Sequence, residues 1–288
     1  LRIISGERIA DELCKIVASQ YPSKGFVELQ RCGLLQLIIP ELTALDIVET
    51  RHGRAHKNNF YHTLEVLENV ARAEERAYAK AKEENPGLPP FKANVWLRWA
   101  ALFHDIGKPK SKRWDNQQGW TFHNHNDIGA RMVPEVFRRL KLPLDSKMKY
   151  VQKLVELHMR PIAIADDVVT DSAVRRLIND AGDDIDDLMM LCEADITSKN
   201  EGRKKQFLEN FRIVREKIAD LKERDYKRLL QPVIDGNEIM ELFHLQPSRE
   251  VGVLKQTLKE AVLENVVPNE REPLMELLKK KAKELGVG

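Results

Sequence analysis

Apolar residues recur every three or four positions along most of the chain, which places them on one face of an α-helix. Ser5 is a suitable cap for a first helix, whose apolar face carries Ile9, Leu13, Ile16 and Val17. The same spacing predicts a short second helix, which carries Leu29, Leu34, Leu35 and Leu37 and ends at Pro40. A third helix starts near His62 and presents Leu64, Leu67, Val70 and Ala71 on one face. Further helices are predicted over 93–103, 128–140, 148–158, 172–179, 185–195, 204–228, 238–243, 251–263 and 272–285.

Two polar segments interrupt this helical pattern. The stretch 50–59 is basic and predicts a loop that delivers His62 to the start of a helix. The stretch with Trp114 and Trp120 predicts a short hairpin or a lid. Runs of alternating β-branched residues are otherwise scarce, so a sheet-based fold is not expected. The sequence therefore predicts an all-α fold.

The composition agrees with a charge-rich helical protein. Of the 288 residues 42% are hydrophobic and 32% are charged. The formal net charge of +2 is too small to indicate nucleic-acid binding by itself. The local cluster of Lys108, Lys110, Lys112 and Arg113 is the more informative feature.

The cysteines and the apolar runs bear on the cellular compartment. Cys14, Cys32 and Cys192 are widely spaced and form no CxxC pair, which argues against a disulfide framework and against a thiolate zinc site. The early apolar run 34–39 is broken by Gln36 and is too short to cross a membrane. We expect no signal peptide. We therefore expect a cytoplasmic protein with no membrane partner.

A histidine–aspartate pair, His104 and Asp105, closes the apolar segment 93–103 and is followed by Ile-Gly-Lys-Pro. His62 lies in an earlier helix start, and Asp195 follows a later helical run. A divalent ion that activates water needs imidazole and carboxylate ligands and an open position. These four residues therefore predict a metal site, in which Asp105 can also bridge a second ion. Mixed His and Asp ligands suit Mn, Mg, Ni, Fe or Co.

Other histidines and one lysine are weaker candidates. His125 and His158 are placed to serve a second metal or a phosphate, although a structural role is the alternative. Lys108 is expected to point toward a substrate phosphate, the alternative being a solvated cation at a helix C-terminus. We interpret His52 and His56 as solvated loop residues. A metal site of this kind predicts phosphoester hydrolysis, with Asp105 and Lys108 as catalytic residues.

These motifs resemble the HD phosphohydrolase superfamily, and their flanks resemble bacterial tRNA nucleotidyltransferases and poly(A) polymerases. Residues 4–13, 33–35 and 40–42 are similar to the RNA-binding neck of that family, and the segments 232–236 and 251–252 are similar to its helical C-terminal part. The resemblance implies an HD-domain helical bundle over 49–215, flanked by a helical neck over 1–48 and a helical tail over 216–288.

The nucleotidyltransferase head of that family has no counterpart in the sequence. The head uses a glycine pair, an Arg-Asp pair and two nearby metal-binding aspartates, whereas the single D-x-D here, Asp184-Ile185-Asp186, opens a helix and has no Gly-Gly upstream. The chain begins at Leu1 rather than at Met. By resemblance it is the part without the head, which we expect upstream in cis.

The function predicted on this basis is a metal-dependent phosphohydrolase attached to a tRNA-binding scaffold. The resemblance implies 2′,3′-cyclic phosphates or phosphomonoesters of nucleotides or tRNA as substrates. A free-standing HD nucleotidase is one alternative. The other is a non-catalytic tRNA-binding module with a structural metal, in which phosphate contacts come from basic groups, either Arg51, Arg54 and Lys57 or Arg203, Lys204 and Lys205.

Overall fold

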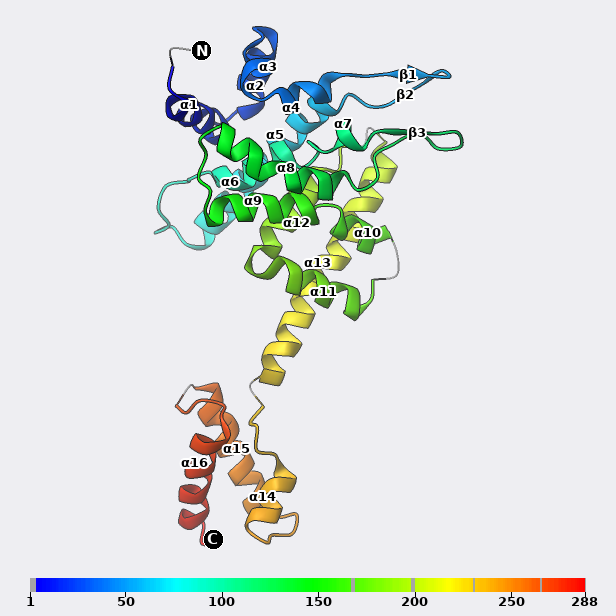
Figure 1. Cartoon of the computed structure of the whole chain (residues 1–288). Helices are drawn as coiled ribbons and strands as arrows, with labels where there is room; N and C mark the ends of the chain where they lie inside the picture. Colours follow the sequence, from blue (N-terminus) through cyan, green and yellow to red (C-terminus); the bar gives the residue numbers. More distant parts are fainter. Residues whose placement is uncertain (1–3, 167–168, 198–199, 230, 265, 288) are drawn as a thin grey trace. The chain divides into compact units, whose positions relative to one another are not determined.

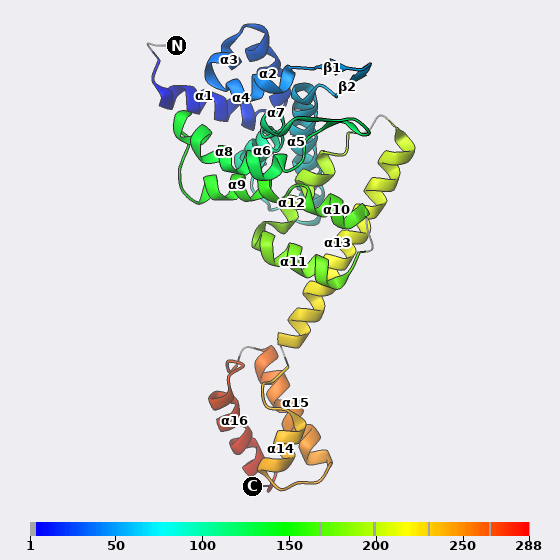
Figure 2. The same ribbon diagram turned by 45° about the vertical axis from the view of Figure 1, so that its right-hand side comes forward.

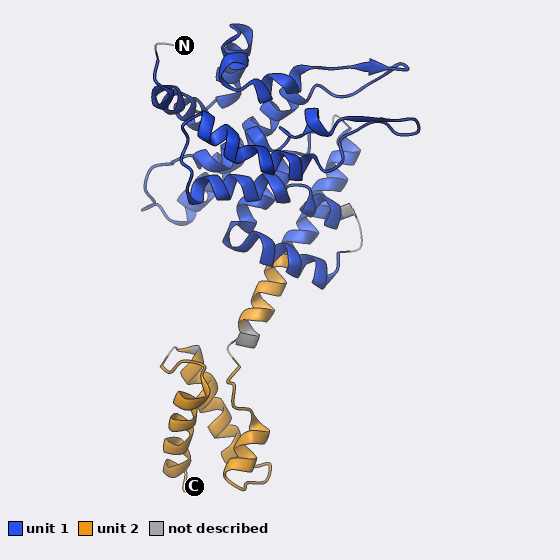
Figure 3. Ribbon diagram, in the orientation of Figure 1, with its two compact units in different colours: residues 1–217 blue, residues 218–288 orange. Residues whose placement is uncertain are grey.

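The computed structural model describes residues 4–166, 169–197, 200–229, 231–264 and 266–287. It forms two compact units, residues 1–217 and residues 218–288, which are coloured separately in Figure 3. Helices make up almost all of the regular structure in both units, and the strands form two short hairpins. The predicted all-α fold is therefore confirmed. The division into segments 1–48, 49–215 and 216–288 stays a prediction.

The first unit opens with short helices at the N-terminus. Helix α1 (Gly6–Ala18) is capped by Ser5 as predicted, since the Ser5 side chain accepts a hydrogen bond from the amide of Arg8. The single short helix expected next is wrong, because Gly33 has a φ of 73° and separates two helices. The elements of this region are α2 (Pro22–Arg31), α3 (Leu34–Ile38), α4 (Pro40–Thr43) and the 3-10 turn η1 (Ala44–Asp46).

Two hairpins lie side by side on one face of this unit (Figure 2). Strands β1 (Thr50–Arg51) and β2 (Arg54–Ala55) form where a loop was predicted. His52 and Gly53 both have positive φ and make the two-residue turn that joins antiparallel strands tightly. Strands β3 (Arg113–Asp115) and β4 (Gly119–Thr121) form the hairpin that the tryptophan segment predicts.

The core of the first unit is a bundle of long helices (Figure 1). Helix α6 (Val95–Phe103) is central, and all its residues from Leu97 onward are buried. Around it pack α5 (Asn59–Glu84) and α9 (Ser146–Leu157), and α8 (His125–Arg139) packs against α9. The short helix α7 (Lys108–Ser111) connects α6 to the second hairpin.

The remaining helices of the first unit are α10 (Arg160–Asp166), α11 (Asp171–Ala181), α12 (Ile185–Ala194) and the first part of α13 (Glu201–Leu229), with the 3-10 turn η2 (Gly182–Asp184) before α12. Helix α10 is not predicted by the sequence pattern. Pro161 ends the preceding helical pattern, but it also lies in the first turn of α10, where a proline is tolerated because its nitrogen needs no hydrogen bond.

The second unit contains α14 (Gly236–Leu242), α15 (Arg249–Leu263) and α16 (Arg271–Glu284), close to the predicted helices. Its small core contains these aliphatic side chains with at most 1% of their surface exposed: Ile234, Ile239, Leu254, Leu258, Leu274, Leu278 and Ala282. Among the described residues of either unit, no helix combines the length and the apolar character needed to cross a membrane.

A buried ion pair connects three helices of the first unit. Arg98 on α6 is fully buried, and its Nε donates to Glu74 Oε2 on α5 at 2.6 Å. Arg98 Nη1 also donates to the carbonyls of Val17 and Ser19 at the end of α1. Burial raises the pKa of Glu74, and the hydrogen bond from Arg98 opposes that shift. The guanidinium thus fixes the N-terminal helix onto the bundle.

We predict that Arg98→Met lowers the free energy of unfolding by about 3–5 kcal/mol, because it leaves the Glu74 carboxylate buried without its partner. Urea denaturation followed by circular dichroism measures the loss. Arg31→Met is the matched control: Arg31 pairs with Glu28 on the surface with 72% of its side chain exposed, and we expect a loss below about 1 kcal/mol. Equal losses in the two variants would contradict this account.

Candidate metal centre

The four predicted ligands meet in the interior of the first unit. His62 comes from the first turn of α5, His104 caps the C-terminus of α6 and is followed by Asp105, and Asp195 caps the C-terminus of α12. His62 Nε2 lies 2.8 Å from Asp195 Oδ1, and His104 Nε2 lies 3.7 Å from the same oxygen. Ligand atoms of these three residues all lie within 4.8 Å of one another. They form the first ligand cluster.

A second ligand cluster adjoins the first and contains Asp105, His125 and His158. His125 Nε2 lies 3.3 Å from Asp105 Oδ1 and 3.2 Å from His158 Nε2. The other carboxylate oxygen, Asp105 Oδ2, faces the first cluster, at 3.3 Å from His104 Nε2 and 3.6 Å from His62 Nε2. Asp105 therefore lies between the two clusters and presents one oxygen to each.

Backbone carbonyls orient three of the four imidazoles. The Nδ1–H groups of His104, His125 and His158 each donate to the carbonyl oxygen three residues earlier in the chain, at 2.7, 2.8 and 2.6 Å. Because a carbonyl only accepts, Nδ1 must carry the proton in each ring. The Nε2 lone pair of the neutral ring then points into the clusters, which is how histidine ligands of metals are usually held.

His62 is oriented by side chains instead. Its Nδ1 lies 3.0 Å from Thr197 Oγ1 and 3.1 Å from Lys57 Nζ, and the lysine ammonium lies 2.7 Å from Thr197 Oγ1. A lysine ammonium only donates, so the Thr197 oxygen is the group that can accept a proton from His62 Nδ1. In that tautomer His62 Nε2 presents its lone pair to the first cluster. In the other tautomer Nδ1 accepts from Lys57 Nζ, and Nε2–H donates to Asp195 Oδ1 at 2.8 Å.

The pKa shifts favour ionised carboxylates at Asp105 and Asp195, a positive charge on His104 and a neutral ring at His158. Burial raises the pKa of a carboxyl group, but the charge of His104 outweighs it at Asp105, whose pKa is held well below its ordinary value. A hydrogen bond from His62 and the charge of His104 likewise lower the pKa of Asp195. Burial disfavours charge on His104 as well, yet the two carboxylates raise its pKa to about 9. Burial and the charge of His104 lower the pKa of His158 to about 3.

These residues fit a divalent cation. His104 Nε2 is buried and has no hydrogen-bond partner among the described residues. A cation between the carboxylates would supply that partner and would take the place of the His104 proton. HD domains bind divalent metals, and each of the two clusters offers three ligand atoms at the spacing that one ion requires.

Lys108 lies at the site and is not a freely solvated cation. Its Nζ is 2.6 Å from Asp105 Oδ2, and only 18% of its side chain is exposed. Lys57 also adjoins the site, through its contacts with His62 and Thr197. Its position was not expected, because the sequence groups Lys57 with the basic loop. Lys57 and Thr197 are 140 positions apart in the sequence, so no local sequence pattern could have predicted their contact.

The other basic loop residues lie on the hairpins and not at the ligand clusters. The Arg51 guanidinium stacks on the ring of Trp114 at 5.1 Å, and Arg54 Nη1 donates to the carbonyl of Gln117 at 3.0 Å. The interpretation of His56 as a solvated residue is wrong, because its ring packs edge-on against Trp120 and Phe122. His52 is exposed as expected.

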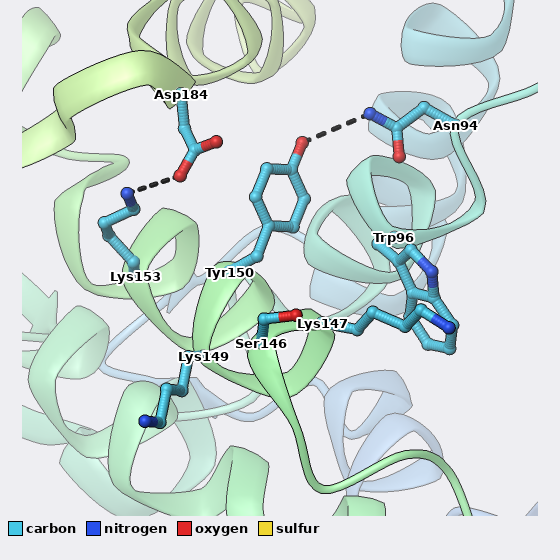
Figure 4. Close-up of a pocket in the computed structure, with 8 residues that line it drawn as sticks. All are labelled: Asn94, Trp96, Ser146, Lys147, Lys149, Tyr150, Lys153 and Asp184. Carbon is cyan, nitrogen blue, oxygen red and sulfur yellow. Dashed lines mark hydrogen bonds and ion pairs between the residues drawn. The ribbon is translucent and has the colours of Figure 1, made fainter.

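A separate cavity of about 500 Å³ lies at the start of α9, and none of the predicted ligands lines it (Figure 4). The Tyr150 hydroxyl contacts Asn94 and donates to Asp187, and Lys153 pairs with Asp184. Asp184 belongs to the D-x-D segment of the sequence. Its pairing with a lysine of the same unit agrees with a structural role for that acidic segment.

Two family models match the chain. The model described as "HD domain" matches residues 59–200, a range that contains both ligand clusters. The model described as "Probable RNA and SrmB-binding site of polymerase A" matches residues 1–45. Both matches confirm the resemblance inferred from the motifs.

Curated relatives include tRNA nucleotidyltransferases. The chain is 30% identical over 262 residues to an A-adding tRNA nucleotidyltransferase of Deinococcus radiodurans, with 88% of this chain and 54% of the relative covered. It is 30% identical over 268 residues to a CC-adding tRNA nucleotidyltransferase of Thermus thermophilus, covering 92% and 55%. A multifunctional CCA protein of Herminiimonas arsenicoxydans is 30% identical over 144 residues, covering 49% and 29%. The chain thus spans about half the length of the first two relatives.

We predict that Thr197→Val weakens Mn²⁺ binding by about 10- to 100-fold, because it removes the acceptor that orients His62 without changing the side-chain volume much. Isothermal titration calorimetry on metal-stripped protein measures the affinity. Thr257→Val is the control, since this hydroxyl donates to the Val253 carbonyl on an exposed helix surface of the second unit. An unchanged Mn²⁺ affinity in Thr197→Val would show that His62 does not depend on this contact.

Proposed function

This chain is an HD-domain protein with an RNA-binding segment of the poly(A) polymerase type and with tRNA nucleotidyltransferases among its relatives, and from that premise we propose that it is a metal-dependent phosphohydrolase. The observation that carries the proposal is the position of Asp105, which presents one oxygen to each of two buried ligand clusters. Such a shared carboxylate suits a pair of divalent ions.

The residues of the site have distinct roles in this proposal. His62, His104 and Asp195 would hold one ion, His125 and His158 would hold a second, and Asp105 would serve both. A divalent ion bound there supplies a water of lowered pKa and stabilises charge on phosphoryl oxygens. Lys108, whose charge lies at the edge of the site, binds a phosphoryl oxygen of the substrate as a point charge.

The substrate class that we propose is a 2′,3′-cyclic phosphate or a phosphomonoester of a nucleotide or of tRNA. Support comes from the family resemblance and from the RNA-binding segment that precedes the HD domain. Because the chain spans about half of its relatives, we also propose that a nucleotidyltransferase head precedes it in the native protein. The cytoplasmic location stays a prediction.

We predict that metal-stripped protein hydrolyses 2′,3′-cyclic AMP when Mg, Mn, Ni or Co is added back. His104→Ala and Asp105→Ala should lower the rate at least 100-fold, since each removes a ligand, and Lys108→Gln should lower it by a smaller factor, since about 1–3 kcal/mol of charge-assisted binding is lost. Chromatography of the nucleotide products gives the rates. Lys110→Gln, a neighbouring lysine outside the ligand clusters, is the control. Absence of turnover in protein that is folded and metal-loaded would contradict the proposal.

A non-catalytic RNA-binding role is a second proposal, favoured by the match of residues 1–45 and by the basic hairpins. Arg51 and Arg54 are exposed and belong to the hairpin β1–β2, which lies beside β4. Lys57 lies instead at the first ligand cluster, so we assign it to that site rather than to the hairpin surface. In this role the metal is structural. A free-standing nucleotidase, by contrast, would bind no tRNA.

We predict that the chain binds tRNA and that affinity falls steeply with salt, because contacts with phosphates release counterions. The double variant Arg51→Ala/Arg54→Ala should flatten the slope of log K against log salt by about 1.5–2. Fluorescence anisotropy with labelled tRNA measures the slope. Arg212→Ala, on an exposed arginine of α13, should leave it almost unchanged. Absence of tRNA binding at low salt would eliminate the RNA-binding role.

A further inference from the structure

A small cavity of about 250 Å³ opens directly beside the first ligand cluster. Asp195, Lys57 and Thr197 supply its polar lining, and Ile162, Ile196 and Phe207 supply its apolar lining. All six residues belong to the first unit. The cavity therefore combines a metal-ligand carboxylate, a cation and a hydrocarbon surface that includes one aromatic ring.

The apolar wall is built by two helices that are tied together. Ile162 lies on α10 and Phe207 on α13, and Asn210 Nδ2 of α13 donates to the carbonyl of Ala165 on α10 at 3.0 Å. On the same helix, Phe211 is fully buried and anchors α13 in the core, while Phe207 remains only partly buried. The ring of Phe207 is thus held in place with part of its surface free for contact.

The positive charge of Lys57 is available to an anion. Its Nζ contacts His62 Nδ1 and Thr197 Oγ1, both of them uncharged groups when His62 is neutral. Within the part of the chain that the structure describes, no carboxylate forms an ion pair with Lys57. A ligand that satisfies this cavity needs an anionic end near Lys57 and a flat apolar body near Phe207.

We propose that this cavity binds the nucleoside of a nucleoside phosphate, with the base against Phe207 and Ile162 and the phosphate near Lys57 and the first cluster. The inference rests on the proposed function for the position of the phosphate. A cavity of about 250 Å³ is smaller than the roughly 300–1,000 Å³ of sites for drug-sized ligands, which argues against a ligand larger than one nucleoside. Stacking on an aromatic ring tolerates any base, because every base has a π-face. The lining therefore predicts selection for a nucleoside without selection among bases.

The test measures binding and not turnover. The Mn²⁺-loaded full chain is titrated, by calorimetry, with the phosphonate analogue of adenosine 3′-phosphate in which a methylene group replaces the ester oxygen and prevents hydrolysis. Methylphosphonate is the matched probe without a nucleoside. The variants are Phe207→Ala and Phe207→Tyr, which keeps the ring. The control is Phe91→Ala, because the exposed Phe91 ring contacts Tyr78 in a tilted geometry away from the cavity.

We expect the nucleoside analogue to bind more tightly than methylphosphonate, and Phe207→Ala to weaken it about tenfold, the usual effect of losing one stacked base. Phe207→Tyr and Phe91→Ala should bind like the parent, and methylphosphonate should bind all four proteins equally. Equal affinities of the parent for the two probes would overturn the proposal. So would a Phe207→Ala variant that weakens both probes alike.

Two further outcomes separate this inference from the proposed function. Binding that depends on Phe207, in a protein without hydrolytic activity, would support the nucleoside site and contradict the hydrolase. Hydrolysis without any preference for a nucleoside would support the hydrolase and contradict the nucleoside site. An oligoribonucleotide that ends in a 3′-phosphate identifies the source of the ligand: competition with the analogue indicates an RNA terminus, and failure to compete indicates a free nucleotide. Either result supports a nucleoside phosphate.

Discussion

The buried carboxylate of Asp105 is the constraint on which the rest of the site depends. Only 1% of this side chain is exposed, and an isolated charge in such a place is costly unless it is paired or coordinates a metal. Five helices supply what the carboxylate needs, since α5, α6, α8, α9 and α12 each carry or end in a ligand. The packing of the bundle can therefore be understood as the means of bringing those helix ends to one point.

The ends of helices are well suited to holding the ligand residues of a metal site. His104, His158 and Asp195 are all C-cap residues, where the last turn of a helix has free carbonyls that can hold an imidazole by its Nδ1–H. Gly107 has a related role. A Cβ at this position would overlap the carbonyl of His125, so the turn after Asp105 can approach α8 only with glycine. The glycine of the His-Asp-Ile-Gly-Lys segment is explained by this contact between the two parts of the site.

The sequence was most informative where the chemistry is local. The apolar helix that ends in His104 and Asp105, the helical run that follows His62 and the one that precedes Asp195 could be recognised from spacing alone. The contact of Lys57 with Thr197 joins segments 140 positions apart, and no periodicity reports on such a contact. The first hairpin was missed because its two-residue strands are too short to show a period of apolar residues. Helix α10 was missed because Pro161 reads as the end of a helix, although it lies in the first turn of α10. The fold class was thus predictable, whereas the surroundings of the ligands were not.

We propose that Asp105 joins two ligand clusters that each hold a divalent ion. The most direct test is the metal content of the full chain after saturation with Mn²⁺ and removal of free metal, measured by inductively coupled plasma mass spectrometry together with protein concentration. The account predicts about two ions per chain in the parent and at most one in Asp105→Asn, with the helical circular dichroism unchanged. Two ions in both proteins, or a single ion in the parent that His125→Ala and His158→Ala do not affect, would contradict it.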